Sequence, residues 1–93
     1  MSAFAAGDRV AVLDVDVPGH IRTPTYVRGR RGVIEREVGR FRNPEELAYG
    51  RSGEPRRMLY RVRFAQRELW ADYAGTAHDT IDVDLYEHWL RKL

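Results

Sequence analysis

The sequence contains no cysteine, which excludes disulfides and any metal site built from thiolates. Its histidines, His20, His78 and His88, are too few and too scattered to predict a metal centre in this chain. No apolar run approaches the roughly 18 residues that a membrane-spanning helix needs, and no signal-peptide pattern opens the chain. We therefore expect a soluble, cytoplasmic protein that binds no metal ion by itself.

The chain also lacks a strong excess of one charge. It carries 16 basic and 14 acidic residues, a net charge of +2, and Lys92 is the single lysine beside 15 arginines. A nucleic-acid-binding domain normally has a larger positive excess and more lysine, so this balance argues against such a partner. GC-rich codon usage explains the arginine preference as well as selection does, so the preference alone assigns no function.

With 93 residues, the chain has room for one domain, which we expect to span residues 1–93. A domain of this size buries only about 60 to 65% of the surface that its unfolded chain exposes. Its own core is therefore marginal, and association with a partner is expected.

Alternating apolar and polar residues predict several short strands. The clearest covers residues 59–64, where Tyr60, Val62 and Phe64 share one face and the intervening arginines share the other. Further strands are expected at 8–13, 32–38 and 80–85, and residues 68–70 are expected to continue the pairing.

One short helix of one or two turns is predicted at residues 43–50. Asn43 is a favourable N-cap and Pro44 suits the first helical position. Several short strands with one helical turn predict a mainly β fold, a small antiparallel barrel.

The longest connection, residues 14–31, is the most unusual part of the sequence, because loops of that length are often functional. In the stretch 19–32, Arg22, Arg28, Arg30 and Arg31 lie among three glycines and one proline. A guanidinium group is flat, forked and always charged, so a rigid loop that carries one suits bidentate binding of an anion. Loop arginines are more often simply solvated, and both interpretations stay open at this point.

Two other groups of residues have a structural interpretation beside a functional one. Asp79, Asp82 and Asp84 with His78 could form a hydrolytic or metal site, but alternation places two of these aspartates on a solvated strand face. The aromatic residues at strand spacing predict core packing rather than a platform for nucleic-acid bases. They are Tyr60, Phe64, Trp70, Tyr86 and Trp89. No Ser-His-Asp set, phosphate loop or zinc motif is present, so any reactive centre is expected in another subunit.

Five separated blocks together resemble one known family. They are Phe4-x-x-Gly7-Asp8-x-Val10, Gly19-His20-x-Arg22-x-Pro24-x-Tyr26-x-Arg28-Gly29-x-x-Gly32, Leu59-Tyr60-x-Val62-x-Phe64, Glu68-Leu69-Trp70 and Asp84-Leu85-Tyr86-Glu87-x-Trp89-Leu90. In this order they resemble the C-terminal domain of the nitrile hydratase beta subunit and its thiocyanate hydrolase relative, from Phe4 to Leu90.

The resemblance implies an SH3-like barrel that is a small non-metal subunit of a heteromeric hydro-lyase, inactive alone. Nitrile hydratases convert a nitrile and water to an amide at a Co(III) or Fe(III) ion, which the alpha subunit holds through cysteines, two of them oxidised. Beta-subunit arginines hydrogen-bond those oxidised cysteines, and Arg28 is the matching residue here. His20, Arg22 and Tyr26 match positions that would support Arg28, and no residue of this chain would bind the metal.

The sequence departs from a full beta subunit because the long helical part is missing. Some family enzymes divide the beta subunit into two chains, as in thiocyanate hydrolase and the three-subunit toyocamycin nitrile hydratase. This chain resembles the small separate subunit of such enzymes. The implied partners are the alpha subunit and a separate helical beta-like subunit, with no nucleic acid and no membrane. An accessory protein that assists metal loading of the alpha subunit is the alternative.

Overall fold

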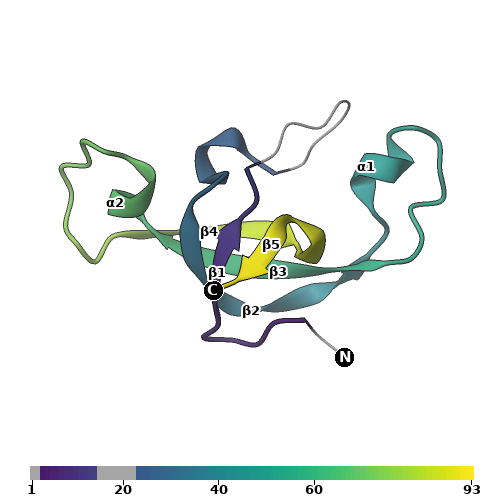
Figure 1. Cartoon of the computed structure of the whole chain (residues 1–93), viewed down its shortest axis with the longest axis horizontal. Helices are drawn as coiled ribbons and strands as arrows, with labels where there is room; N and C mark the ends of the chain where they lie inside the picture. The colour runs from purple at the N-terminus through teal and green to yellow at the C-terminus, as the bar shows by residue number, and fades with distance from the viewer. Residues whose placement is uncertain (1–2, 15–22) are drawn as a thin grey trace.

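The computed structural model describes residues 3–14 and 23–93, which form a five-stranded antiparallel sheet (Figure 1). The strands are β1 (Arg9–Val12), β2 (Arg31–Phe41), β3 (Arg57–Ala65), β4 (Thr80–Tyr86) and β5 (Leu90–Lys92). Their order in the sheet is β4-β3-β2-β1-β5, so β4 and β5 form its two edges. The predicted mainly β, antiparallel fold is confirmed, as an open sheet consistent with a small barrel-like domain.

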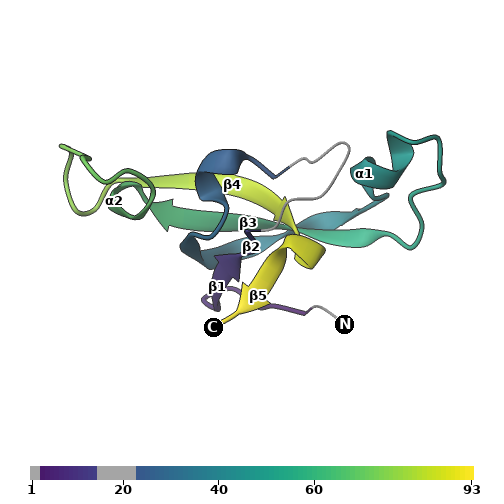
Figure 2. The same ribbon diagram turned by 45° about the horizontal axis from the view of Figure 1, so that its top comes forward.

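Short helical segments connect the strands. The α-helical turns are α1 (Pro44–Leu47) and α2 (Gln66–Leu69), and the 3-10 turns are η1 (Thr25–Val27) and η2 (Glu87–Trp89). Both ribbon views place α1 and α2 at opposite ends of the molecule (Figures 1 and 2). Among the described residues, no helix is long and apolar enough to cross a membrane.

β3 contributes several side chains to the core because its apolar residues alternate as predicted. Tyr60, Val62 and Phe64 are fully buried, whereas the arginines between them lie on the other face. Phe4 packs edge-on against Tyr60 with 5.3 Å between ring centroids, and its backbone N–H donates to the tyrosine hydroxyl at 3.1 Å. These contacts thereby attach the N-terminal segment to β3.

β2 passes close to β3 at Gly32. A Cβ atom on this glycine would lie 2.7 Å from Cγ1 of Val62 and 3.0 Å from the carbonyl oxygen of Arg63. Real Cβ atoms do not approach other atoms that closely, so no side chain fits here. β2 is also longer than the predicted strand 32–38, because its pairing with β3 continues to Phe41 through two register shifts.

The predicted helix near residue 43 is present as α1. The Oδ1 atom of Asn43 accepts a hydrogen bond from the backbone N–H of Glu45 at 3.0 Å, as an N-cap does. Gly50 follows with φ +74, the left-handed conformation that ends many helices.

The expected strand at residues 68–70 is wrong. Residues 66–69 form α2, which is closed by a 3.1 Å hydrogen bond from the Trp70 backbone N–H to the Gln66 carbonyl. Gln, Arg, Glu and Leu all favour helix, and only Leu69 of this turn enters the core. Trp70 is consequently 43% exposed and is not the core residue that its spacing predicted.

Candidate functional site

The described part of the arginine loop is a rigid turn that ends at Arg28. η1 is held by backbone hydrogen bonds from Val27 to Pro24 (3.3 Å) and from Arg28 to Thr25 (3.2 Å). Val27 is fully buried and anchors the turn in the core. Gly29 then adopts φ +75 and donates its N–H to the Val12 carbonyl at 2.9 Å, which joins the loop to β1. Arg28 therefore projects from a fixed backbone.

The Arg28 side chain is partly buried and held by its own chain. Its Nη2 atom donates to the carbonyl oxygen of Thr23 at 2.9 Å, and its guanidinium carbon lies 5.5 Å from the centre of the Trp89 ring. Its Nε atom is buried and has no hydrogen-bond partner among the described residues. Among the side chains that the structure describes, no carboxylate forms an ion pair with this guanidinium. The charge is thus fixed in place but not neutralised within this part of the chain.

Trp89 is itself fixed by a carboxylate from a distant element. Its indole Nε1–H donates to Oε2 of Glu45 at 2.9 Å, and the other oxygen, Oε1, lies 2.8 Å from Nε2 of His88. Trp89 is only 5% exposed. Glu45 of α1 therefore binds two successive side chains of η2, and Arg28 stacks on the second of them.

The residues expected to support Arg28 have different outcomes. His20 and Arg22 lie outside the described residues. Tyr26 is 38% exposed and stacks on Trp70, with 5.6 Å between ring centroids and an interplanar angle of 26°. Arg30 is exposed. The sequence did not predict Glu45 as a neighbour of the arginine site, because no local pattern links Glu45 to Trp89, which lies 44 positions further along the chain.

The aspartates form ion pairs and hydrogen bonds rather than a catalytic group. Arg61 binds both oxygens of Asp84 (2.9 and 3.3 Å) and Arg63 binds both oxygens of Asp82 (2.9 and 3.1 Å), across β3 and β4. The hydrogen bond from Arg63 holds the pKa of Asp82 below its ordinary value. The predicted solvated face is therefore confirmed.

Asp79 belongs to the loop that follows α2. It accepts hydrogen bonds from the Tyr73 hydroxyl and from the backbone and hydroxyl of Thr76. The bond from Tyr73 lowers the pKa of Asp79 and raises that of Tyr73. Asp79 thus orders this loop.

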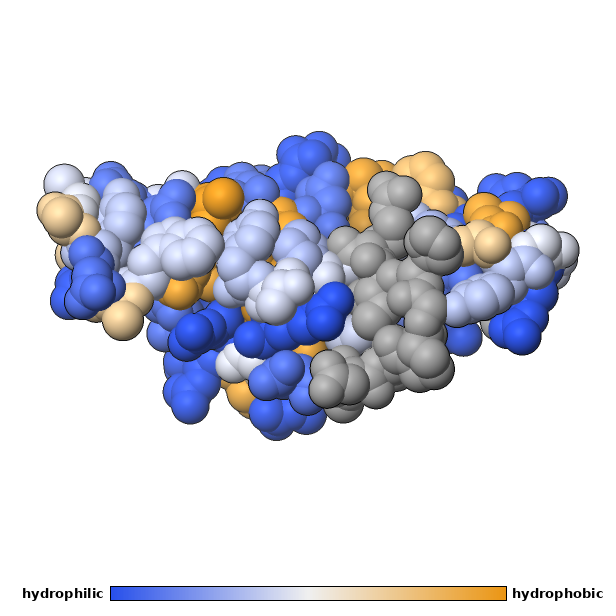
Figure 3. Space-filling model, turned by 90° about the horizontal axis from the view of Figure 1, so that it is seen from above, coloured by the Kyte–Doolittle hydropathy of each residue, from blue (hydrophilic) through white to orange (hydrophobic). Residues whose placement is uncertain are grey.

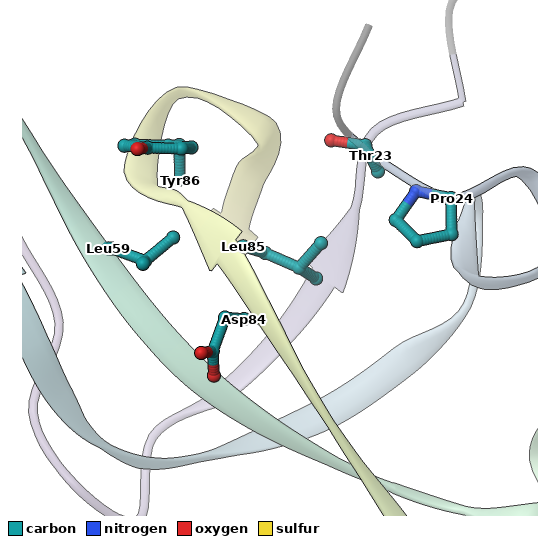
Figure 4. A pocket seen from close by; sticks show the side chains of 6 residues that line it. All are labelled: Thr23, Pro24, Leu59, Asp84, Leu85 and Tyr86. Carbon is teal, nitrogen blue, oxygen red and sulfur yellow. The ribbon is translucent and has the colours of Figure 1, made fainter. Parts of the chain in front are cut away.

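A small pocket of about 220 Å³ lies between the start of the described loop and β3–β4 (Figure 4). Figure 4 shows Thr23 and Pro24 across the pocket from Leu59 and Tyr86, and Leu85 and Asp84 complete the lining. The Asp84 carboxylate is already bound by Arg61. The pocket thus offers no free carboxylate for acid–base chemistry.

The described residues contain no cluster of three or more His, Asp or Glu side chains that could hold a metal ion. The face seen in Figure 3 is mostly hydrophilic, with hydrophobic residues in small separate groups. Fold and site together define a small β domain that presents a positioned arginine.

Comparison with known proteins identifies the family. Residues 1–92 match the model of the family described as "Nitrile hydratase beta subunit, C-terminal", and the chain belongs to this family. It is 39% identical over 90 residues to the nitrile hydratase subunit beta of Pseudomonas chlororaphis, which covers 96% of this chain and 40% of that protein. The chain therefore spans about two fifths of the length of this beta subunit.

A subunit of thiocyanate hydrolase is another relative of this chain. Subunit alpha of this enzyme from Thiobacillus thioparus is 38% identical over 92 residues, which cover 98% of this chain and 72% of that protein. A structure of the recombinant apo-enzyme from the same organism superposes with a TM-score of 0.93 at 36% identity, covering 100% of this chain and 78% of that chain. The family resemblance expected from the five sequence blocks is confirmed.

Proposed function

We propose that this chain is a small subunit of a heteromeric nitrile hydratase or thiocyanate hydrolase, and that Arg28 binds the oxidised cysteines of a partner subunit. Family membership supports the first part, since the relatives are named subunits of these two enzymes. The surroundings of Arg28 support the second part, its binding of oxidised cysteines. Arg28 is a partly buried, immobilised cation with no carboxylate partner among the described residues.

The chemistry of the guanidinium fits this role. Arginine has five N–H donors in a rigid fork, and the described residues supply an acceptor to one of its nitrogen atoms, Nη2. A sulfinate is an oxyanion with paired oxygens, which such a fork can bind bidentately. A partner anion would also neutralise the charge that the described residues leave uncompensated.

The metal ion that the family implies does not fit this chain. The chain has no cysteine, and its described residues contain no group of three potential ligands. In the proposed enzyme the cobalt or iron ion, held by the alpha subunit, supplies the centre at which water adds to the nitrile. The contribution of the present chain is to hold a fixed positive charge beside that centre.

The proposal is tested by co-expressing the chain with its alpha partner and the helical beta-like subunit, then measuring co-purification, metal content and amide formation. Arg28→Lys keeps the charge but removes the fork. Truncating one member of a buried charge pair costs about 2 to 5 kcal/mol. Activity should therefore fall at least about tenfold, while the melting temperature of the isolated chain stays unchanged.

Arg30→Lys is the matched control, because Arg30 lies two residues further along the same loop and is exposed. Arg51→Lys, in the β2–β3 connection, is a second and remote control. Neither should change activity. Full activity of Arg28→Lys would remove Arg28 from the site and favour the accessory role. Amide formation by the isolated chain, or about one equivalent of tightly bound cobalt or iron in it, would contradict the proposed division of labour.

A further inference from the structure

Three segments far apart in the sequence meet beside Arg28: η1, α1 and η2. Glu45 of α1 accepts a hydrogen bond from Trp89 of η2, and the ring of Trp89 lies under the Arg28 guanidinium. We infer that Glu45 is a positioning residue for Arg28 and that it acts through the indole of Trp89. This inference rests on the role proposed above for Arg28.

The Glu45 carboxylate is well placed to fix the indole. Its side chain is 19% exposed, and each oxygen has a partner, at 2.8 Å for His88 and 2.9 Å for Trp89. A carboxylate bound by two successive residues of one turn fixes both the position and the rotation of the second one. The plane on which Arg28 stacks is therefore set by α1.

The carboxylate also strengthens the stack. An indole that donates its N–H to an anion becomes richer in electron density, since hydrogen bonds in a chain polarise one another. A cation over the face of tryptophan is attracted by that density. Glu45 thus attracts the guanidinium through the ring.

Acting through the ring has a chemical advantage over a direct ion pair. A carboxylate bound to Arg28 would occupy its N–H donors, and those donors would no longer be free for an external anion. No ion pair joins Glu45 to Arg28 in the structure, because the carboxylate oxygens face Trp89 and His88. Glu45 therefore orients the cation without occupying any of its N–H donors.

A simpler interpretation is that Glu45 only attaches α1 to η2. The two interpretations differ in what happens to Arg28 itself, so the test follows Arg28 directly. Glu45→Gln keeps the shape and removes the charge. Glu54→Gln makes the same change on the same β2–β3 connection, where Glu54 is exposed and pairs with Arg42 and Arg56.

The first measurement uses NMR on the full chain without any partner. Hydrogen exchange of the Arg28 Nε–H should accelerate at least about twofold in Glu45→Gln, the smallest effect expected when a cation–π contact weakens. The indole N–H signal of Trp89 should shift while that of Trp70 stays in place, with Trp70→Phe used for assignment. Glu54→Gln should change neither signal.

Trp89→Phe is a second variant, and it tests the route of the effect. It keeps an aromatic ring under Arg28 but cannot donate to Glu45, so it should accelerate Arg28 exchange as Glu45→Gln does. Adding Glu45→Gln to it should then have no further effect on Arg28. Unchanged Arg28 exchange in folded Glu45→Gln would overturn the inference, whatever the activity of the complex.

The second measurement is a double-mutant cycle in the reconstituted enzyme. Glu45→Gln should lower kcat about three- to tenfold alone, and the Glu45→Gln, Arg28→Lys double variant should be no worse than Arg28→Lys. Additive losses would show that Glu45 does not act through Arg28. If Arg28→Lys is fully active while Arg28 exchange responds to Glu45→Gln, the positioning inference holds and the proposed function fails.

Discussion

Replacing Phe64 by alanine should destabilise the protein more than most single changes. Phe64 is fully buried near the C-terminal end of β3, so its truncation leaves a cavity that the surrounding strands cannot fill. Such a change costs about 3 to 5 kcal/mol. The total free energy of unfolding of a domain of this kind is about 5 to 15 kcal/mol, so the loss is a large part of the stability. In a chain of this length, each kcal/mol lowers the melting temperature by about 4 to 8 °C.

Urea unfolding followed by circular dichroism is the assay, with Arg63→Ala as the neighbouring comparison. Arg63 lies on the opposite face of the same strand, and its ion pair with Asp82 is solvent-exposed, so its loss should move the midpoint only slightly. Phe64→Leu provides a smaller truncation, expected to cost about 1 kcal/mol, if Phe64→Ala is too unstable to measure. A larger midpoint shift for Arg63→Ala than for Phe64→Ala would refute the assignment of the faces.

Two further predictions concern the same sheet. Gly32→Ala should cost about 1 to 3 kcal/mol, because its new methyl group would lie 2.7 Å from Val62 and must displace β2 or β3; a neutral result in urea unfolding would contradict the close approach. The pKa of Asp82 is lower in the folded state than its unfolded value of about 3.9. The stability that ionised Asp82 contributes is therefore present above its unfolded pKa and is lost as the pH falls through its folded pKa. At pH 6, the wild type should accordingly unfold at a higher urea concentration than Asp82→Asn, and this difference in midpoint should disappear on acidification. A difference that stays constant down to pH 2 would count against the ion pair.

Periodicity predicted the central strands well because their residues face two distinct environments. Tyr60, Val62 and Phe64 alternate with charged residues along β3, and a half-buried sheet requires that pattern. Periodicity gave the wrong structure at residues 68–70, where the apolar pair Leu69 and Trp70 resembled part of a strand. The local preference for helix determined the structure instead, and residues 66–69 form a helical turn. A single turn carries too few residues for periodicity to identify it.

The arginine site was only half predictable. The loop chemistry identified the stretch with four arginines as unusual, and only the resemblance to the family selected Arg28 among them as the residue proposed to bind an anion. Neither indicated that Trp89 would lie under the guanidinium or that Glu45 would bind the indole, since both contacts depend on how η1, α1 and η2 meet in the fold. Long-range contacts of this kind are fixed by the whole fold and leave no trace in local spacing.

The meeting of η1, α1 and η2 has a consequence for biosynthesis. Glu45 and Trp89 are 44 residues apart, and Trp89 immediately precedes β5, the last strand. Contacts between such distant segments form late in folding, after the entropic cost of closing the intervening chain has been met. A partner that needs the positioned guanidinium would therefore reject chains whose last strand has not docked, so subunit assembly would itself select correctly folded copies.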